Sequence, residues 1–456
     1  MTLPPPRVLA AGELPADAPH VPVAIVGAGA CGLVAAIALR EAGVGCVLLE
    51  RDARPAGSTA LSSGFVPAGG TRAQRDAGVD DSPDRFAADI VAKAKGRAAP
   101  HLVQAYTQAI PRAIDHLAEA HGFAFEVLDG FLYPGHGVRR MHALPEKTGA
   151  ALVAKLDATA AALGADLLAE AVVRDLHVDE GKRVRGIGFV RPGGSLEHLR
   201  CDVLLLACNG FGGNTALVDE LLPQMRGATF GGHVGNDGSA LLWGRALGAG
   251  LADLGGYQGH GSWVVPQGIL MTWAVMMEGG VQLNARGRRF HDETNGYSEA
   301  AVEVLAQPGQ VAWNVFDDRL LALARTFPDF REAEAAGALR TVQDRTSLAA
   351  TIGCAVEDLD PALDRFTPPY HAVKVTGALF HTQGGLAIDA QARVLDARGR
   401  AFPNLLAAGG AARGVSGDAV WGYLSGNGLL SAVAGGWIAA RTAAAALGQE
   451  GQGPWT

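Results

Sequence analysis

Cysteine is scarce in this chain, and its few cysteines are not spaced as ligands. The 456 residues include five cysteines, with no CxxC pair, no haem-attachment CxxCH and no zinc spacing. The sequence therefore predicts neither a disulfide framework nor a metal site. Unpaired cysteines of this kind favour a reducing compartment, and we expect the protein to be cytoplasmic.

Clustered positive charge and long apolar segments are also missing. The net charge is −8 with lysine and arginine scattered, which argues against a nucleic-acid partner. The first 20 residues hold three consecutive prolines and no basic-then-apolar segment, so no signal peptide or anchor is expected. The most apolar late stretch, 426–447, is interrupted by Asn427 and Arg441, which favours a buried helix over an integral membrane segment.

Glycine, in contrast, is abundant. It accounts for 62 of 456 residues, about twice the usual share of ~7%. Because 48% of the chain is hydrophobic and 18% is charged, it can bury a large core, and disorder is excluded. The excess glycine is therefore expected at turns inside a folded domain.

Residues 22–50 form the strongest local pattern. PVAIVG is typical of a buried parallel strand, LVAAIALREAG of a helix and CVLLE of a second strand, with GAGACG at the first turn. In such a βαβ unit Gly27 permits a tight turn, Gly29 lets the backbone approach a pyrophosphate, and Gly32 allows close helix packing. Glu50 ends the second strand, where it is placed to accept hydrogen bonds from ribose hydroxyls. The pattern predicts a dinucleotide site.

Patterns in further segments predict additional helices, strands and turns. The stretch 56–74 is rich in small and hydroxyl side chains, and we expect either a loop lying against a planar ring or a flexible linker. Helices are predicted at 83–121, 150–164 and 426–443, a hairpin turning at Asp179, Glu180 and Gly181, and a buried strand with a glycine turn at 201–214.

The composition of the chain changes between residues 251 and 365, where aromatic and charged residues are more frequent. This shift predicts an inserted domain. The predicted fold class is α/β with an α+β cap, in which a Rossmann-like domain (21–250 and 366–447) is interrupted by a capping domain (251–365).

Several ordered segments carry a family resemblance: GAGACG with Glu50, GSTALSSG, LLLACNGFGGN, GNDGSAL, YQGH, GGVQLNARGRRFHDE, HTQGGLAIDAQARVLDARG, and NLLAAGG followed by GNGLLSA. Over nearly its whole length the chain resembles the flavoprotein family of soluble fumarate reductases, succinate dehydrogenase flavoprotein subunits and 3-ketosteroid 1-dehydrogenases. The resemblance implies a Rossmann-like FAD-binding domain and a capping domain that brings substrate to the flavin.

The resemblance also implies which residues hold FAD. Some family members attach FAD through a histidine in the segment matching GSTALSSG; none occurs between Gly57 and Gly64, so non-covalent FAD is expected. Gly410 stands where the family usually has an acid. The implied cofactor contacts are Gly27, Gly29, Gly32, Glu50, Arg51, Ser58, Thr59, Ser62, Ser63, Gly64, Val173 through its backbone, Asp237, His381, Gly409, Asn427 and Leu429.

Fumarate reductases hold two carboxylates with cations and protonate substrate from an arginine. By the resemblance, these catalytic positions fall here on Trp273, Met276, Tyr297, Phe380 and Tyr423. The neutral phenol of a tyrosine cannot supply the positive charge and the paired N–H donors with which an arginine binds a carboxylate. A desolvated dicarboxylate would therefore be left without compensating charge.

The two tyrosines match ketosteroid dehydrogenases instead. By that resemblance, Tyr423 hydrogen-bonds a substrate carbonyl, with a backbone N–H near Asn427 as second donor. Tyr297 takes the α-proton and shares it with another tyrosine, for which Tyr133 is preferred over Tyr106. The expected substrate contacts are Asn427, His260, Gln258, Trp273, Phe380 and Trp421.

Together these residues predict an FAD-dependent oxidoreductase acting on CH–CH groups. It would introduce a C=C bond beside the ketone of an apolar ring, either a 3-ketosteroid or a smaller cyclohexanone-type ring, and pass electrons to a quinone, oxygen or a carrier protein. Two alternatives stay open. One is a fumarate-type reductase of an unsaturated acid with Arg139 or Arg140 as a relocated clamp, and the other is an electron-transferring subunit of a larger complex.

Overall fold

The chain divides into two compact units in a computed structural model, which describes residues 3–455. The first unit comprises Met1–Leu221, Gly232–Tyr257 and His381–Thr456, and the second comprises Leu222–Gly231 and Gln258–Phe380. The predicted α/β class is confirmed. The exact domain boundaries at 250 and 365 stay a prediction.

The first unit is built on a nine-stranded sheet. Strand β10 pairs in parallel with β2 and β21, and β2 continues in parallel to β3 and β7. The predicted hairpin is present as β8 and β9, which extend the sheet in antiparallel fashion. The strands of this sheet are β1 (Arg7–Ala10), β2 (His20–Val26), β3 (Cys46–Leu49), β7 (Asp166–Leu168), β8 (Val172–Val178), β9 (Val184–Val190), β10 (Leu196–Leu206), β20 (Arg393–Leu395) and β21 (Ala401–Ala407).

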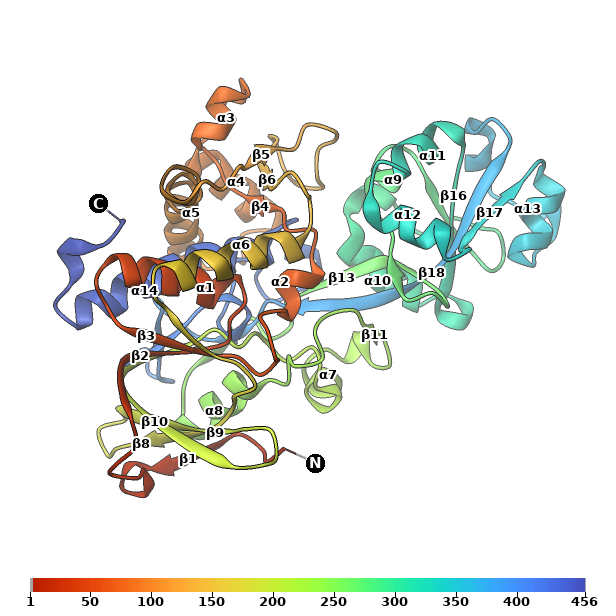
Figure 1. The fold of residues 1–456 in the computed structure, drawn as a ribbon. Helices are drawn as coiled ribbons and strands as arrows, with labels where there is room; N and C mark the ends of the chain where they lie inside the picture. The colour runs from red at the N-terminus through yellow and green to blue at the C-terminus, as the bar shows by residue number, and fades with distance from the viewer. Residues whose placement is uncertain (1–2, 456) are drawn as a thin grey trace. The chain divides into compact units, whose positions relative to one another are not determined.

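Helices α1, α6 and α14 pack together over strands β2 and β3 (Figure 1). Ten of the twelve residues of α1 are buried, because small and aliphatic side chains cover all of its faces. The helices of this unit are α1 (Ala30–Glu41), α2 (Gly57–Leu61), α3 (Arg72–Asp76), α4 (Pro83–Lys93), α5 (Pro100–His121), α6 (Gly149–Ala162), α7 (Thr215–Leu221), α8 (Ser239–Leu247) and α14 (Asn427–Ala446).

Two predicted segments differ in the structure. The single helix expected over 83–121 is two helices, α4 and α5, because Lys95 and Gly96 adopt positive φ angles of 49° and 76° and Pro100 begins a new helix. The stretch 56–74, expected to be a loop, contains the helix α2, the strand β4 (Val66–Pro67) and the start of α3. A capping box at Thr71 and Gln74 starts α3.

Helix α14 is long and apolar enough to cross a membrane by length and composition. In the structure, 61% of its most apolar window is buried inside the protein, and it packs against α1 and α5. This burial matches the buried helix predicted for the stretch. The compartment of the protein stays a prediction.

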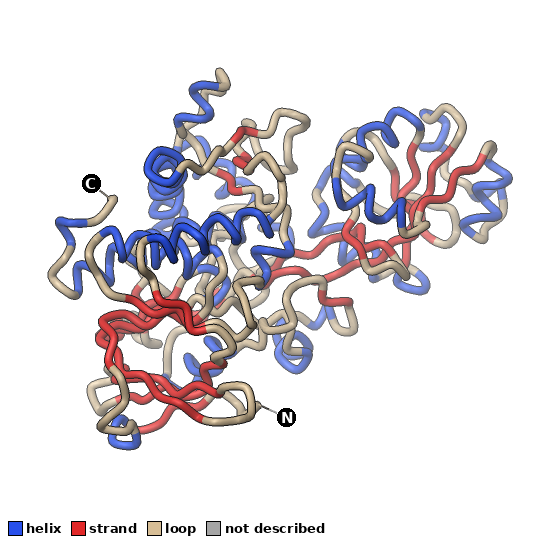
Figure 2. The backbone as a smooth tube through the Cα atoms, in the orientation of Figure 1, coloured by secondary structure: helices blue, strands red, loops and turns tan. Residues whose placement is uncertain are grey.

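The second unit contains a seven-stranded sheet in the order β14-β13-β18-β16-β15, with β11 and β17 also paired to β18. Figure 2 shows its strands with helices around them. The strands are β11 (Thr229–Phe230), β13 (Tyr257–Val264), β14 (Ile269–Leu270), β15 (Val281–Asn284), β16 (Val311–Phe316), β17 (Leu339–Val342) and β18 (Tyr370–Thr382). The helices are α9 (Ala274–Met277), α10 (Tyr297–Leu305), α11 (Asp318–Ala324), α12 (Pro328–Ala335) and α13 (Arg345–Ile352).

Two smaller sheets complete the first unit. One pairs β12 (Leu251–Ala252) with β19 (Gly385–Leu386). The other joins β4, β6 (Met141–Ala143) and β5 (Glu126–Val127) around the buried His142. His142 Nδ1 donates to the Arg140 carbonyl at 2.9 Å, and Nε2 accepts from the Thr71 hydroxyl at 2.7 Å. Burial lowers the pKa of His142 to about 4, so the ring is neutral at physiological pH.

We expect the free energy of unfolding to fall as the pH is lowered from 7 to 5. Below ~6.5 an unfolded His142 takes up a proton that the folded ring does not accept until about pH 4, so this group costs up to about 1.4 kcal/mol per pH unit in that window. Urea unfolding of the protein at several pH values measures the slope. His142→Gln should reduce it and His20→Gln, at an exposed histidine, should not. An identical slope in His142→Gln contradicts the assignment.

Candidate functional site

The turn after β2 has the geometry that its glycine spacing predicts. A Cβ at Gly27, where φ is 105°, would lie 2.6 Å from the Ala207 carbonyl oxygen, and a Cβ at Gly32 would lie 2.0 Å from the Gly27 carbonyl oxygen. At Gly29 the nearest protein atom would be Thr59 Oγ1 at 3.6 Å. Gly27 and Gly32 are therefore required by the fold, whereas the space at Gly29 is open to a ligand.

Glu50 lies directly beside this turn. Its carboxylate accepts the N–H of Ala28 at 2.9 Å and the N–H of Asp52 at 3.0 Å. Burial raises the pKa of Glu50 above its ordinary value, although these two donors oppose the shift. A carboxylate has about four acceptor positions, so two remain to receive ribose hydroxyls.

Arg51 and Asp237 belong to one charged network in the first unit. Arg51 donates to the Gly235 carbonyl at 2.7 Å, and Arg174 lies 2.9 Å from the Asp237 carboxylate. Burial alone would raise the pKa of Asp237, but hydrogen bonds from Ser239 and the charge of Arg174 outweigh it and lower the pKa. This network holds the loop 233–239 against the residue that follows Glu50.

The segment GSTALSSG places two hydroxyls at the glycine turn. Thr59 Oγ1 accepts the N–H of Ala30 at 3.2 Å, at the first residue of α1. Ser58 Oγ accepts from the side-chain amides of Asn209 at 3.0 Å and Asn236 at 2.8 Å. Because both acceptor positions of this hydroxyl are filled, its hydrogen is left to donate to a ligand.

The rest of this segment shapes the backbone. Ser62 Oγ donates to the Thr59 carbonyl at 2.7 Å and accepts the N–H of Gly64 at 3.1 Å. A Cβ at Gly64 would lie 2.7 Å from the Thr148 carbonyl oxygen, just before α6. Ser63 is exposed. Ser62 and Gly64 therefore fix the loop, and their contact with FAD stays a prediction, as does that of Ser63.

Hydrogen bonds connect four side chains in the C-terminal part of the first unit. The Asn427 amide donates to Ser416 Oγ at 2.9 Å, the Ser416 hydroxyl donates to Gln383 Oε1 at 2.9 Å, and the Gln383 amide donates to His381 Nδ1 at 2.7 Å. Burial lowers the pKa of His381 to about 4. The neutral ring therefore carries its proton on Nε2, which faces Gly410.

Asn209 occupies the space that a side chain at Gly410 would need. A Cβ at Gly410 would lie 2.1 Å from Asn209 Oδ1 and 2.8 Å from His381 Nε2. Any side chain at this position would displace one of these two groups, which explains why glycine stands there. Sequence reasoning did not single out Asn209, although it directly precedes Gly210 in a glycine-rich turn and has a positive φ of 65°.

Tyr423 faces the first turn of α14. A Cβ at Gly428 would lie 3.8 Å from the Tyr423 hydroxyl and 3.8 Å from His381 Nδ1. Asn427 begins this helix and is fully buried, and the neighbouring Leu429 is half-buried. The predicted carbonyl donor and four predicted cofactor contacts (His381, Gly409, Asn427 and Leu429) thus lie in or near three segments of one unit: the end of β18, the turn after β21 and the start of α14.

The second unit gathers the predicted substrate residues into an aromatic group. The ring of Tyr297, the first residue of α10, stacks on His260 with centroids 4.8 Å apart and planes 18° apart. Trp273 and Phe380 meet the same imidazole edge-on at 5.7 and 5.9 Å. Burial lowers the pKa of His260 to about 3. Its Nδ1 accepts the N–H of Ser262, so the ring is neutral, with its proton on Nε2.

An ion pair between the exposed Arg289 and the buried Glu293 supports this aromatic group and was missed at the level of sequence. Arg289 Nε donates to Glu293 Oε2 at 2.8 Å, and Glu293 Oε1 accepts the N–H of Gln282 at 2.8 Å. The indole N–H of Trp273 donates to the Glu293 carbonyl at 3.1 Å. Glu293 thereby fixes Trp273 and the turn that precedes Tyr297. The i,i+4 spacing of Arg289 and Glu293 within RRFHDE is the signal that could have revealed it.

Four other predicted residues have simpler surroundings. Tyr133 packs on Phe131 with centroids 4.3 Å apart. Trp421 lies under the ammonium of Lys95 at 4.4 Å, a cation–π contact. Val173 is buried in β8, and Gln258 is half-buried in β13. Their functional roles stay predictions.

The proposed relocated clamp at Arg140 is wrong. Arg140 is 1% exposed, and its guanidinium pairs with Asp81 at 3.0 Å and with Asp89. A cation already neutralised by two carboxylates does not bind a third. The neighbouring Arg139 is exposed.

The glycine turn, the acidic end of β3 and the neighbouring hydroxyls define the first unit as a dinucleotide-binding domain of the flavoprotein class. The chain belongs to the FAD binding domain family, whose model matches residues 22–429. It is 28% identical over 446 residues to the probable fumarate reductase Ifc3 of Shewanella frigidimarina (strain NCIMB 400), covering 92% of this chain and 74% of that protein. It is 24% identical over 515 residues to the 4-oxocyclohexanecarboxylate 2-dehydrogenase of Sinomonas cyclohexanicum, covering 85% and 87%.

Solved structures show the same fold. The open conformation of a flavocytochrome c3 fumarate reductase matches with a TM-score of 0.80 and 26% identity, over 94% of this chain and 78% of that one. The 3-ketosteroid-Δ4-(5α)-dehydrogenase of Rhodococcus jostii RHA1 matches with a TM-score of 0.76 and 22% identity, over 96% and 99%. The protein is an FAD-dependent oxidoreductase acting on CH–CH groups.

The residues present fit FAD. Among the described residues, Asn427 Oδ1 and Ser431 Oγ are buried without a hydrogen-bond partner, and the structure leaves space at Gly29 and a donor at Ser58. Buried polar atoms without partners are costly unless a ligand or water satisfies them. FAD is therefore the cofactor, and its non-covalent attachment stays a prediction.

Proposed function

We propose that the protein introduces a C=C bond α,β to the ketone of a small apolar ring of the cyclohexanone type. The observation that carries this proposal is the setting of Tyr297. It stacks on a neutral, buried His260 in a group completed by Trp273 and Phe380. None of these four side chains carries the positive charge that a dicarboxylate requires.

Tyr423 activates the ketone in this proposal. Its hydroxyl donates a hydrogen bond to the carbonyl oxygen, and a backbone N–H at the start of α14, near Asn427, is the second donor. Such donors stabilise the developing enolate by about 3 kcal/mol each and make the α-hydrogen more acidic. The stabilisation is realised as negative charge develops on the oxygen, so it appears in the rate more than in substrate affinity.

Tyr297 takes the α-proton. A phenol with an ordinary pKa of ~10 is a weak base at neutral pH, so it needs a partner that shares the proton. His260, which stacks on Tyr297, is neutral, and Tyr133 is the proposed partner. Bound FAD supplies the acceptor for the β-hydrogen as hydride.

The smaller ring is favoured over a steroid by the name of one relative. A relative that aligns over 85% of this chain is named for a 4-oxocyclohexanecarboxylate, which is a cyclohexanone that also carries a carboxylate. The likeness to ketosteroid dehydrogenase structures lies below 25% identity and supports the fold alone. The electron acceptor is proposed to be a quinone, oxygen or a carrier protein.

A second candidate is a reductase of an unsaturated acid of the fumarate type. It is favoured by the 28% identity to a probable fumarate reductase and the 26% identity to the flavocytochrome structure. With Arg140 paired to Asp81 and Asp89, the exposed Arg139 is the remaining residue for the clamp that the sequence suggested. An electron-transferring subunit would be indicated by a second chain that co-purifies.

An anaerobic substrate panel separates the two chemistries. We expect saturated cyclohexanones to bleach the flavin of the oxidised enzyme and to turn over with an artificial acceptor. We also expect fumarate and other unsaturated dicarboxylates to leave the chemically reduced flavin unoxidised. Rapid reoxidation by an unsaturated acid, with no bleaching by any ketone, would establish the reductase instead.

A further inference from the structure

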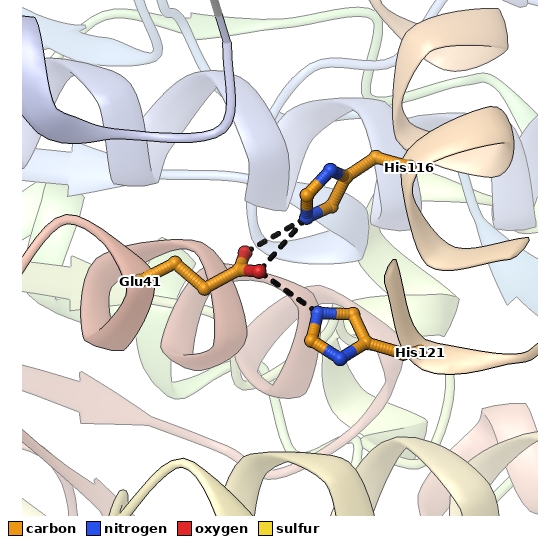
Figure 3. Close-up of side chains that lie close together, drawn as sticks. All are labelled: Glu41, His116 and His121. Carbon is orange, nitrogen blue, oxygen red and sulfur yellow. Dashed lines mark hydrogen bonds and ion pairs between the residues drawn. The ribbon is translucent and has the colours of Figure 1, made fainter. Parts of the chain in front are cut away.

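A group of three side chains that the flavin site does not use lies in the first unit, between two of its helices. Glu41 is the last residue of α1, His121 is the last residue of α5, and His116 lies five residues earlier on α5. Figure 3 shows the carboxylate of Glu41 between the two imidazole rings, with a nitrogen of each ring directed at it.

The three donor groups already converge. His116 Nε2 lies 2.9 Å from Glu41 Oε1 and 3.0 Å from Oε2, and His121 Nε2 lies 2.9 Å from Oε1. One ligand atom from each residue lies within 4.8 Å of the others. Ligands about 2.1 Å from a tetrahedral zinc ion are roughly 3.4 Å from one another, so small side-chain shifts would admit an ion.

We infer that Glu41, His116 and His121 form a Zn²⁺ site that joins the C-terminal ends of α1 and α5. Two imidazoles and one carboxylate are a donor set that zinc accepts, with a water molecule at the fourth position. On binding, the hydrogen of each neutral ring resides on Nδ1, and Nε2 offers its lone pair to the metal.

The surroundings allow an ion to enter and keep the ligands in place. The side chains of His116, His121 and Glu41 are 22%, 13% and 17% exposed, so solvent reaches all three. The two rings stand edge to face with centroids 5.5 Å apart, and His116 also packs on Trp437 of α14 at 5.3 Å. Gly122, with a φ of 63°, ends α5 directly after His121 and fixes where that ring projects.

Sequence spacing alone does not reveal this site. His116 and His121 are five residues apart, which differs from the i,i+4 spacing typical of metal-binding helices, and Glu41 lies 75 residues before His116. The packing of α5 beside α1 brings the three together. Cysteine spacing predicted no metal site. That argument concerns cysteine ligands and does not apply to this group of one glutamate and two histidines.

Metal titration of the FAD-loaded protein tests the inference. After chelator treatment, the full chain is titrated with Zn²⁺ alone, and bound zinc is counted per chain by calorimetry and elemental analysis. We expect one equivalent to bind and to raise the midpoint of thermal unfolding as its concentration increases. His116→Gln and His121→Gln should lose that equivalent, while their FAD content and ketone turnover stay unchanged.

Two comparisons keep the outcome decisive. Glu41→Gln keeps an amide oxygen that can accept from the histidines but removes the negative charge, and it should weaken zinc binding. His20→Gln is the matched control, because His20 also lies beside a carboxylate, Asp202 at 3.1 Å, without a second histidine; it should bind zinc as the unmodified protein does. No bound zinc in the unmodified protein, or equal binding in His116→Gln and His121→Gln, overturns the inference and leaves the group an ion pair.

Discussion

Replacing Tyr297 or Tyr423 by phenylalanine is expected to slow ketone dehydrogenation about 10²–10³-fold. Tyr423→Phe removes a donor to the developing enolate, and Tyr297→Phe removes the group that takes the α-proton. Because both interactions strengthen in the transition state, kcat should fall while KM changes little. Steady-state kinetics with a cyclohexanone substrate and an artificial acceptor measure both effects, with FAD content recorded for each variant.

Tyr370→Phe is the matched control for this experiment. Tyr370 is a buried tyrosine at the start of β18, and it has no place in the proposed chemistry. We expect its loss to leave turnover within a small factor of the unmodified protein. Full turnover in Tyr297→Phe or Tyr423→Phe, with normal flavin content, would refute the proposed roles.

Gly29→Ala is expected to abolish most FAD binding without unfolding the protein. The added methyl group would meet only Thr59 Oγ1, at the ordinary contact distance of 3.6 Å, so the protein itself accommodates it. The methyl would instead occupy the space through which the backbone approaches the pyrophosphate. Fluorescence titration of the apoprotein with FAD should show an affinity reduced at least tenfold, corresponding to about 1.4 kcal/mol.

Substitutions at two other glycines serve as controls for this test. Gly12→Ala, with nothing within 4 Å of the added Cβ, should bind FAD normally. Gly32→Ala would place its Cβ 2.0 Å from the Gly27 carbonyl oxygen, so it should lower the thermal stability of the apoprotein as well as FAD binding. If Gly29→Ala binds FAD as tightly as Gly12→Ala, the cofactor does not approach the backbone at this turn.

The expected effects on FAD binding and on stability differ because the glycines of this turn have different surroundings. Gly27 and Gly32 are required because neighbouring backbone fills the space of a side chain, and this is a property of the fold. Gly29 is predicted to be required because a ligand fills that space, which would be a property of function. Spacing in the sequence predicts all three residues equally, and only the distances in the structure distinguish them.

The sequence by itself determined the βαβ unit with Glu50, the flavoprotein family and the α/β class. The family was recognised by the resemblance of several ordered segments, whereas the βαβ unit and the α/β class depend on local patterns: short apolar runs, glycine at fixed intervals and an acid at a strand end. Such patterns survive in the linear chain because each element forms from residues near one another. The break between α4 and α5 was missed, because the positive φ of Lys95 is not dictated by its residue type.

Only the tertiary structure decided which distant groups share a site. It placed Asn209 in the space beside Gly410, committed Arg140 to two aspartates, and anchored Trp273 through Glu293. It also brought Glu41 against His116 across 75 residues of sequence. Side-chain hydrogen bonds and ion pairs form between elements that meet only when the sheet and its helices pack. Their partners are therefore fixed by distances in the folded chain and not by spacing along it.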